Sequence, residues 1–324
     1  MRTVSILFLG LMLTWSRLVE AQDYDTNDIV VQTFAGSGFY GYYDGQGALT
    51  MFNQPSAVAA DSSSNLFVLE KGNGLIRKIT PDATVSTYAS LGGLSLGGVL
   101  TSDSSNNLWG VSSSFGPGYV VRIGPSGLFL QIPVPYAVSL NGLCLDSANN
   151  VYVSDNYSNK IYRYKPATGW EVFVGSGNLG AVDGNWIFTS FNNPRALAAD
   201  SSDNIYVWDA GNRLIRRINQ GRDVVTVAGN NQGYYYSEAD GSGTNAYFNT
   251  VNDMRMDSAG NLLLACGNSV RRLSASSNVT TIAGGFNQSG YTNGPGALAR
   301  FRNASGICIV QGLIYVADAD DQRI

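Results

Sequence analysis

Residues 61–70, DSSSNLFVLE, join a polar five-residue turn to a short apolar run, and this combination occurs five times in the chain. The other copies are DSSNNLWGVS (103–112), DSANNVYVSD (146–155), DSSDNIYVWD (200–209) and DSAGNLLLAC (257–266). An aspartate that opens a turn can accept hydrogen bonds from the backbone of that turn, and the fourth turn position mostly carries residue types that tolerate positive φ. We therefore predict structural repeat turns at Asp61, Asp103, Asp146, Asp200 and Asp257.

The sequence around each turn reads as further strands. Around the first turn, PSAVAAD (55–61) precedes it, and GLIRKIT (74–80) and TVSTYAS (84–90) follow the apolar run. Alternating apolar residues, β-branched residues and flanking Gly, Asn and Ser favour strands over helices. Units of four antiparallel strands, repeated about every 40 to 57 residues, predict an all-β β-propeller.

One unit resembles an established repeat family. Residues 31–79, VQTFAGSGFYGYYDGQGALTMFNQPSAVAADSSSNLFVLEKGNGLIRKI, resemble an NHL repeat, including its DGxG, Phe and Pro segment before the first strand. The resemblance extends from about Ile29 to Ile324 and is weakest around Asp103. It implies an NHL-type propeller, but a fold of this kind does not by itself define an activity.

The repeats predict six four-stranded blades. The sixth would begin within RFRNASGICIVQGLIYVADADDQRI (300–324), which ends where a third strand is expected. At the other end, DIVVQTFAGSG (28–38) reads as a fourth strand without the preceding three. Because closure removes exposed sheet edges, we expect this N-terminal strand to complete the ring against an incomplete last blade. Continuation of the chain beyond Ile324 is the alternative that this expectation leaves open.

The N-terminal segment predicts export. Residues 1–22, MRTVSILFLGLMLTWSRLVEAQ, combine an early arginine, a short apolar core and a cleavage-like end. This pattern is typical of a secretory signal peptide over residues 1–21, with the propeller over 22–324; an uncleaved anchor is the alternative. The formal net charge of the whole chain is −4, which makes nucleic acid an improbable partner. We expect a secreted, extracellular protein without membrane insertion after cleavage.

The cysteines and glycosylation sequons are less informative. Cys144, Cys266 and Cys308 all lie in apolar strands, and an odd number cannot pair completely within the chain. Buried free thiols are the default expectation, with a Cys266–Cys308 bridge as the alternative. Sequons begin at Asn156, Asn278, Asn287 and Asn303, which makes these residues possible glycosylation sites.

The chain contains no histidine. Propellers related through the resemblance include a zinc lyase and calcium-dependent lactonases, whose sites use histidine, so neither mechanism transfers to this sequence. Oxygen-rich segments at 317–322 (ADADDQ) and 155–159 (DNYSN) allow calcium, although neither matches a known calcium loop and solvated turns explain them as well. We therefore expect a protein that is not an enzyme and has no required cofactor, with a calcium-dependent hydrolase or lyase-like enzyme as the alternative.

The long loops between blades are the best candidate for a binding surface. They span residues 38–52, 177–191, 233–248 and 290–301, and should emerge on one face of the propeller. Aromatic side chains suit recognition because they offer a large amphipathic surface at low entropic cost. The predicted ligand-binding residues are Tyr40, Tyr42, Tyr43, Trp186, Tyr234, Tyr235 and Tyr236.

Other residues of these loops have a structural interpretation. The Asp-Gly pairs at Asp44, Asp183 and Asp240 should form turns, and Phe52, Phe191, Phe248 and Phe301 should pack in the core. Basic residues recur in the third strand and should pair with turn carbonyls or acids such as Asp155 and Asp209; they are Arg77, Arg122, Arg163, Arg216 and Arg271. The sequence thus predicts a recognition or scaffold module that binds an extracellular protein, peptide or glycan through the loop face. An ectodomain of a longer receptor or adhesion protein is a further alternative.

Overall fold

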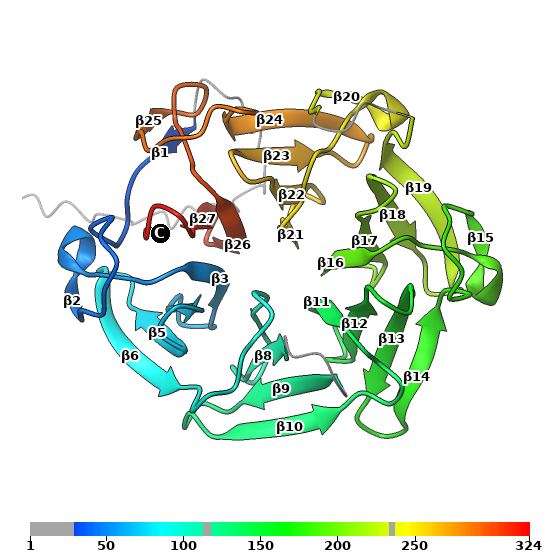
Figure 1. Cartoon of the computed structure of the whole chain (residues 1–324), viewed down its shortest axis with the longest axis horizontal. Helices are drawn as coiled ribbons and strands as arrows, with labels where there is room; N and C mark the ends of the chain where they lie inside the picture. Colours follow the sequence, from blue (N-terminus) through cyan, green and yellow to red (C-terminus); the bar gives the residue numbers. More distant parts are fainter. Residues whose placement is uncertain (1–28, 113–117, 233–236) are drawn as a thin grey trace, which may run out of the picture.

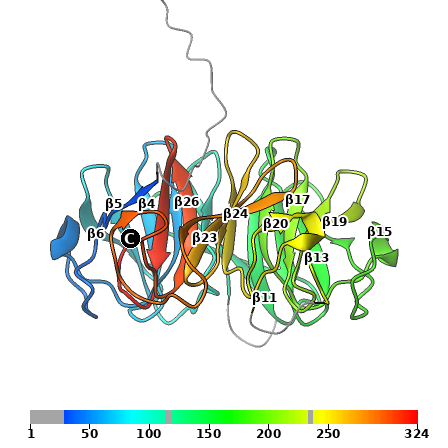
Figure 2. The same cartoon turned by 90° about the horizontal axis from the view of Figure 1, so that it is seen from above.

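The structure, a computed structural model, describes residues 29–112, 118–232 and 237–324. Strands make up nearly all regular structure in this part of the chain, with three short 3-10 helices: η1 (Gly47–Leu49), η2 (Trp186–Phe188) and η3 (Gly243–Asn245). The sheets stand side by side around a central axis (Figure 1) and form a disc when seen from the side (Figure 2). No helix in the described ranges is long and apolar enough to cross a membrane.

Five antiparallel sheets form the blades, each with its first strand nearest the axis. Blade 1 contains β3 (Pro55–Ala60), β4 (Leu66–Glu70), β5 (Leu75–Ile79), β6 (Thr84–Ser90) and the outer β2 (Gly45–Gln46). Blade 2 contains β7 (Thr101–Ser102), β8 (Leu108–Val111), β9 (Tyr119–Ile123) and β10 (Phe129–Pro133). Blade 3 contains β11 (Leu140–Leu145), β12 (Val151–Asp155), β13 (Lys160–Lys165) and β14 (Gly169–Val174). Blade 4 contains β16 (Pro194–Ala199), β17 (Ile205–Asp209), β18 (Leu214–Ile218), β19 (Asp223–Gly229) and the outer β15 (Gly184–Asn185). Blade 5 contains β21 (Asp253–Met256), β22 (Leu262–Ala265), β23 (Ser269–Leu273), β24 (Asn278–Gly284) and the outer β20 (Gly241–Ser242).

The protein is therefore a β-propeller, but the prediction of six four-stranded blades is wrong. The structure has five blades of four or five strands. Between blade 5 and blade 1 stands a hairpin of β26 (Ala304–Val310) and β27 (Leu313–Asp318), which is a two-stranded sheet of its own. The expected closure by the N-terminal strand is also wrong, because β1 (Val30–Val31) pairs with β25 (Gly294–Pro295) and not with the hairpin.

The path of the chain after β27 explains the difference. The backbone turns back at Asp318, which pairs with Arg323, so the last residues form a loop where another strand was expected. The N–H groups of Phe34 and Ala35 donate to the carbonyl of Ile324 at 2.7 and 3.1 Å, and the N–H of Ile324 donates to the carbonyl of Ala35 at 2.9 Å. The two ends of the described chain thus meet through backbone hydrogen bonds without sharing a sheet.

Neighbouring inner strands approach each other through backbone atoms. A Cβ at Gly142 of β11 would lie 2.0 Å from the carbonyl oxygen of Arg195 on β16. The Ser154 hydroxyl donates to the same carbonyl at 2.7 Å. Between the hairpin and blade 1, a Cβ at Gly306 would lie 2.7 Å from Cα of Ala57. Glycine is required at both contacts because no side chain fits between the strands.

The repeat turns, which follow the C-terminal ends of the inner strands, form hydrogen bonds between neighbouring blades. Each turn aspartate accepts hydrogen bonds from backbone N–H groups two and four residues later, at 2.7 to 3.0 Å. The fourth turn residue reaches the preceding blade: Asn106 accepts from the N–H of Ser62 at 2.9 Å, and Asp203 accepts from the N–H of Ser147 at 2.8 Å. These bonds couple adjacent blades without burying apolar surface.

Gly260 interrupts this series between blades 4 and 5. It has a φ of +81° and nothing within 4 Å of the place a Cβ would take. Gly260→Asn should raise the free energy of unfolding by about 0.5 kcal/mol, because a new hydrogen bond to Ser201 outweighs the modest cost of this backbone conformation for asparagine. Urea denaturation measures the change. Gly260→Ala is the control, since it carries the backbone cost without the bond. An Asn variant no more stable than the Ala variant would contradict the expectation.

Candidate functional site

Three blades carry a fully buried arginine in the middle of the third strand: Arg77, Arg216 and Arg271. In blade 4, Arg216 donates to Asp209 at 2.9 Å and to the carbonyls of Ser190 and Val182 at 3.2 and 2.9 Å. The same guanidinium pairs with Asp183 of the preceding loop at 2.7 Å. The corresponding partners in the other two blades are Asp44 with the carbonyls of Tyr43 and Met51, and Asp240 with the carbonyls of Ala239 and Tyr247. These arginines fix the long inter-blade loops to the blades.

The loop phenylalanines pack in the core, as expected, and three of them, Phe52, Phe191 and Phe248, lie beneath the buried arginines. Phe52, Phe191, Phe248 and Phe301 are all buried. Cζ of Arg216 lies 5.1 Å from the ring centroid of Phe191. A basic residue recurs in the third strand of every blade, as expected: Arg122 and Arg163 lie opposite the second residue of the second strand, as Lys78, Arg217 and Arg272 do. The fully buried arginine, opposite the third residue of that strand, is replaced by Val121 in blade 2 and by Tyr162 in blade 3.

Blade 5 differs from blades 1 and 4 in the carboxylate that lies beside its buried arginine. Blades 1 and 4 end the second strand with Glu70 and Asp209, and burial raises the pKa of Asp209 to about 6. Blade 5 has Cys266 at this place, nine residues after its turn aspartate. Glu238 approaches Arg271 from the loop instead, and burial raises the pKa of Glu238 to about 7 while the arginine opposes the shift. A carboxylate is thus kept near the buried charge by a different element.

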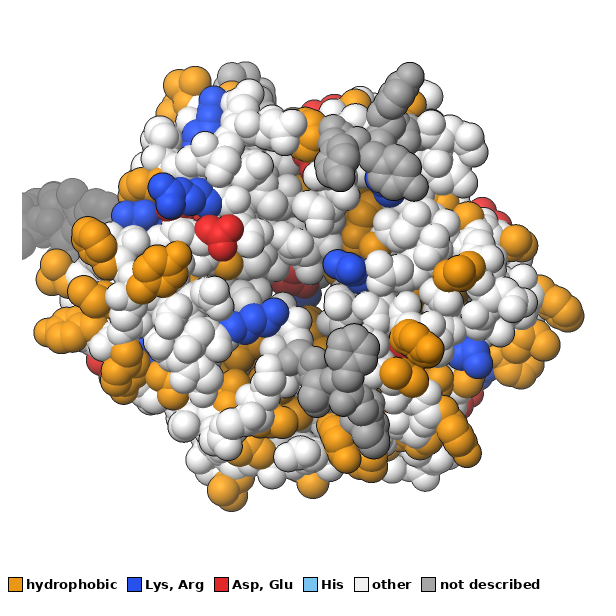
Figure 3. Space-filling model, viewed as in Figure 1, with side chains coloured by type: hydrophobic (Ala, Val, Ile, Leu, Met, Phe, Trp, Pro, Cys, Tyr) orange, Lys and Arg blue, Asp and Glu red, His pale blue; other side chains and the backbone are white. Residues whose placement is uncertain are grey.

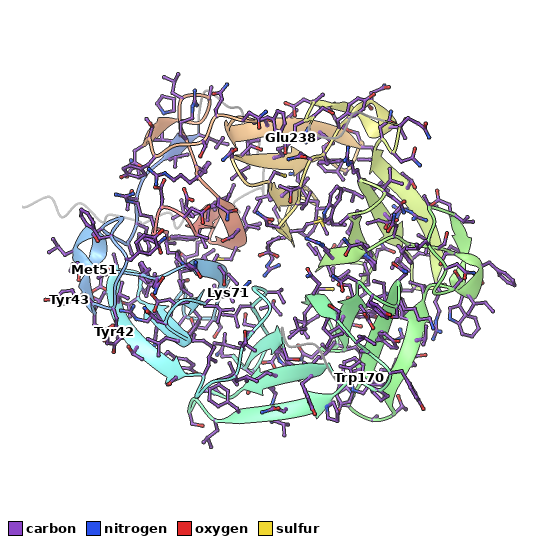
Figure 4. The ribbon with its side chains drawn as sticks, viewed as in Figure 1. Tyr42, Tyr43, Met51, Lys71, Trp170 and Glu238 are labelled. Carbon is purple, nitrogen blue, oxygen red and sulfur yellow. The ribbon has the colours of Figure 1, made fainter. Side chains whose placement is uncertain are left out.

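The predicted aromatic residues lie on the rim of the disc. Tyr40, Tyr42 and Tyr43 are exposed, and the Tyr42 hydroxyl lies 2.8 Å from the Thr87 hydroxyl on outer strand β6. Figure 4 shows Tyr42 and Tyr43 on the outside of blade 1, away from the ring centre. Trp186 lies on the rim of blade 4, with Cζ of Arg222 5.1 Å from its ring centroid. Since blades 1 and 4 face each other across the ring (Figure 1), the structure does not bring these aromatics into one site. Tyr234, Tyr235 and Tyr236 lie outside the described residues.

A polar cavity of about 380 Å³ opens at the centre of the ring, where the inner strands begin. Figure 3 shows the hollow at the middle of this view. Its polar and charged lining residues are Gln54, Ser56, Lys71, Asn141, Arg195, Asn252, Asn303, Ser305 and Asp320. The lining holds amides, hydroxyls and charges together with glycine backbone, and just two small apolar side chains, Val251 and Ala319. Such a site can exchange many hydrogen bonds with a polar ligand.

One position of the repeat supplies much of this lining. The residue five before each turn aspartate lines the cavity; these residues are Ser56, Gly98, Asn141, Arg195 and Asn252. In the hairpin, Ser305 is the equivalent residue, because Ala304 pairs with Asp318 as Pro194 pairs with Asp209. We call this the axial position. Five blades and the hairpin thus each place one residue at the same cavity, and these six residues are of four types: serine, glycine, asparagine and arginine.

Sequence reasoning missed the axial position, although a signal for it was present. The inner-strand segments PSAVAAD, LNGLCLD, PRALAAD and VNDMRMD are all polar at their second residue, which is Ser, Asn, Arg or Asn. A variable polar residue on an otherwise apolar repeated strand is unusual for a core strand. The pattern alone, however, does not show that strands far apart in the sequence converge on one axis.

Three charged groups line the cavity. Lys71 follows β4 and its ammonium lies over Gly98, where a Cβ would be 2.7 Å from Nζ. Within the described residues, neither this ammonium nor the Asp320 carboxylate has an ion-pair or hydrogen-bond partner, and Arg195 has a weak bond to Asn193 at 3.4 Å. Surrounding protein lowers the pKa of Lys71 by removing part of its water. Figure 4 shows Lys71 beside the ring centre.

Further along the inner strand of blade 5, three residues beyond Asn252, the side chain of Arg255 reaches across the ring to blade 2. Its Nη2 donates to the carbonyl of Leu100 at 2.7 Å, and its Nη1 donates to Asp253 at 2.6 Å. The Asp253 carboxylate is buried, which raises its pKa, and it also accepts the N–H of Ile307 at 3.1 Å. This side chain thus connects blades 5 and 2 across the ring.

The remaining predicted sites have these positions. Cys144, Cys266 and Cys308 are buried free thiols, and burial raises the pKa of Cys308 to about 12. Asn278 and Asn287 are exposed, whereas Asn156 and Asn303 are partly buried. The residues described here contain no cluster of three or more His, Cys, Asp or Glu side chains that could hold a metal.

Comparison with known proteins supports the fold. No family model matches the chain. The Arabidopsis thaliana protein Suppressor of Quenching 1, chloroplastic, is 26% identical over 206 residues, which are 62% of this chain and 17% of that protein. An auxiliary nutrient binding protein from Bacteroides thetaiotaomicron superposes with a TM-score of 0.72 at 18% identity, over 90% of this chain and 74% of that one. A catalytically inactive virginiamycin B lyase from Staphylococcus aureus, with quinupristin, gives 0.58 at 14% identity, over 88% and 95%.

These likenesses show a β-propeller. They include a binding protein and an enzyme, and at these identities they carry the fold and no activity. The chain spans about a sixth of the length of the Arabidopsis relative. Membership of the NHL-repeat family, export and the signal peptide stay predictions.

Proposed function

We propose that the protein is an exported, non-catalytic recognition module that binds a polar ligand in the central cavity of its loop-bearing face. The axial position carries the proposal. Its residues lie at or just before the start of the inner strands, whose following residues are mostly buried, and they are serine, glycine, asparagine or arginine. Variable residues on a rigid repeated frame are where binding specificity is usually found. A ligand that fits within the cavity would not reach the tyrosines on the rim; a larger partner could contact them.

The absence of paired catalytic groups in the lining favours binding over catalysis. Among the described residues, the lining has one carboxylate, Asp320, and the full sequence has no histidine. General acid–base chemistry on a glycosidic bond needs two carboxyl groups. The similarity to an auxiliary nutrient binding protein supports the proposal at the level of the fold.

A variant that fills the cavity tests this function. Asn141→Trp places a large side chain at the axial position of blade 3, and Ser202→Trp on an exposed repeat turn is the matched control. Neutral sugars, sugar acids, amino sugars, amino acids and short peptides are screened by thermal shift. At least one class should raise the Tm of the wild type and of Ser202→Trp, but not that of Asn141→Trp. No response to any class, or an equal response in Asn141→Trp, would contradict the proposed function.

A further inference from the structure

The charges around the cavity are unevenly distributed. Blade 4 contributes the guanidinium of Arg195 at its axial position. Blade 3, which lies between blades 2 and 4, contributes the amide of Asn141. The axial residue of blade 2 is Gly98, whose missing side chain leaves room for the ammonium of Lys71 from blade 1. Lys71, Asn141 and Arg195 therefore form a cationic arc over blades 2 to 4.

The other side of the cavity has different chemistry. Blade 5 and the hairpin contribute the amides of Asn252 and Asn303, the Ser305 hydroxyl and the Asp320 carboxylate. Asn252 already donates to the carbonyl of Ala304 at 2.9 Å, so this side has its amides in fixed orientations. Groups of this kind accept and donate hydrogen bonds to hydroxyls. None of the described residues that line the cavity is aromatic.

The geometry points to a sugar acid as the ligand, with its carboxylate on the arc of Lys71, Asn141 and Arg195 and its hydroxyls on the side of Asn252, Asn303 and Asp320. This inference rests on the proposed function and specifies the ligand of that same cavity. Lys71 and Arg195 are exposed cations without strong partners among the described residues, so both are free to pair with an anion that enters the cavity. A carboxylate supplies the complementary charge and accepts hydrogen bonds from guanidinium, ammonium and amide groups, which are the three kinds of group on the arc.

The lining also distinguishes a sugar acid from a peptide C-terminus, which carries the same anionic group. A peptide would place apolar side chains and their Cα atoms against the opposite side, where the lining is amide, hydroxyl and carboxylate. A body that carries several hydroxyls can add hydrogen bonds to those that these groups already make, whereas an apolar side chain can add none.

Isothermal titration of the exported chain tests the inference with matched probes. D-Glucuronate carries the carboxylate, D-glucuronamide is its neutral isostere, and glycylglycine represents a peptide end. D-Glucuronate should bind at least about tenfold more tightly than D-glucuronamide, since charge-assisted bonds are roughly twice as strong as neutral ones. Its affinity should also fall with added salt.

Two variants assign this difference to the cationic arc. Lys71→Met and Arg195→Gln should each weaken D-glucuronate binding about tenfold and leave D-glucuronamide binding unchanged. Neither side chain is part of the core, so both variants should fold. Lys160→Met is the control, because Lys160 follows a loop of the same face and does not line the cavity.

The outcomes separate the inference from the function on which it rests. Equal affinity for D-glucuronate and D-glucuronamide, or equal loss in Lys160→Met, would overturn the anionic assignment while leaving a binding cavity. Tighter binding of glycylglycine would overturn the sugar assignment. If no compound in the wider screen responds, the proposed function fails and this inference fails with it.

Discussion

Arg216→Met should lower the free energy of unfolding by about 3–5 kcal/mol, which is the usual cost of removing one partner of a buried ion pair. Asp209 would remain fully buried without its counter-charge, although Asn192 and Asn212 still donate to it. The carbonyls of Ser190 and Val182 would also lose a donor. The loop at residues 177–191 should loosen around Asp183, although β15 remains paired with β19 and Thr226 still donates to Asp183.

The loss should depend on pH in a defined direction. Burial already raises the pKa of Asp209 to about 6, and removal of the arginine raises it further. Near pH 5 the carboxyl of the variant takes up a proton and avoids a lone buried charge, so the destabilisation should be smaller there than at pH 8. Urea denaturation at both pH values measures it. Arg217→Met, at an exposed position one residue later, should cost under about 1 kcal/mol. Equal costs for the two variants would refute the role assigned to the buried arginine.

Gly142→Ala should destabilise the protein by about 3 kcal/mol, at the upper end of the usual cost of overpacking. The new methyl group would lie 2.0 Å from the carbonyl oxygen of Arg195, so blades 3 and 4 would have to separate. These backbone atoms belong to strands β11 and β16, each of which is hydrogen-bonded within its own sheet, so they cannot move aside as a flexible side chain can. The same shift would move Asn141 and Arg195 relative to each other, so ligand binding in the cavity should weaken as well.

Gly124→Ala is the matched control for this substitution. Its Cβ would meet nothing closer than 3.8 Å, so the same chemical change should alter the free energy of unfolding by less than about 0.5 kcal/mol. Thermal and urea denaturation of the two variants provide the comparison. A Gly142→Ala protein as stable as Gly124→Ala would show that the inner strands can separate at little cost.

The strands and turns were predictable because their causes are local. The turn aspartates bind backbone groups two and four residues away, so a five-residue pattern contains all the interacting atoms. Alternating apolar residues reflect the period of a strand, which any short window shows. The burial of Phe52 and Phe191 could likewise be predicted, because their positions repeat with the turns.

The number of blades was not predictable in this way. A sixth unit has the local pattern of two strands, and the structure forms those two strands as β26 and β27. Whether further strands join them depends on the path of residues 318–324 and on partners almost 290 residues away in the chain. Strand pairing over such separations leaves no local periodic signal.

For the candidate site, too, some features are local in the sequence and others depend on the tertiary structure. The sequence by itself determined that apolar strands repeat, that each is preceded by a turn of fixed chemistry, and that long aromatic loops lie between units. Only the tertiary structure decided that the aromatics stand apart on the rim while Ser56, Asn141, Arg195 and Asn252 meet at the axis. The physical reason is that side-chain alternation is a property of one strand, whereas convergence on an axis is a property of the ring of sheets.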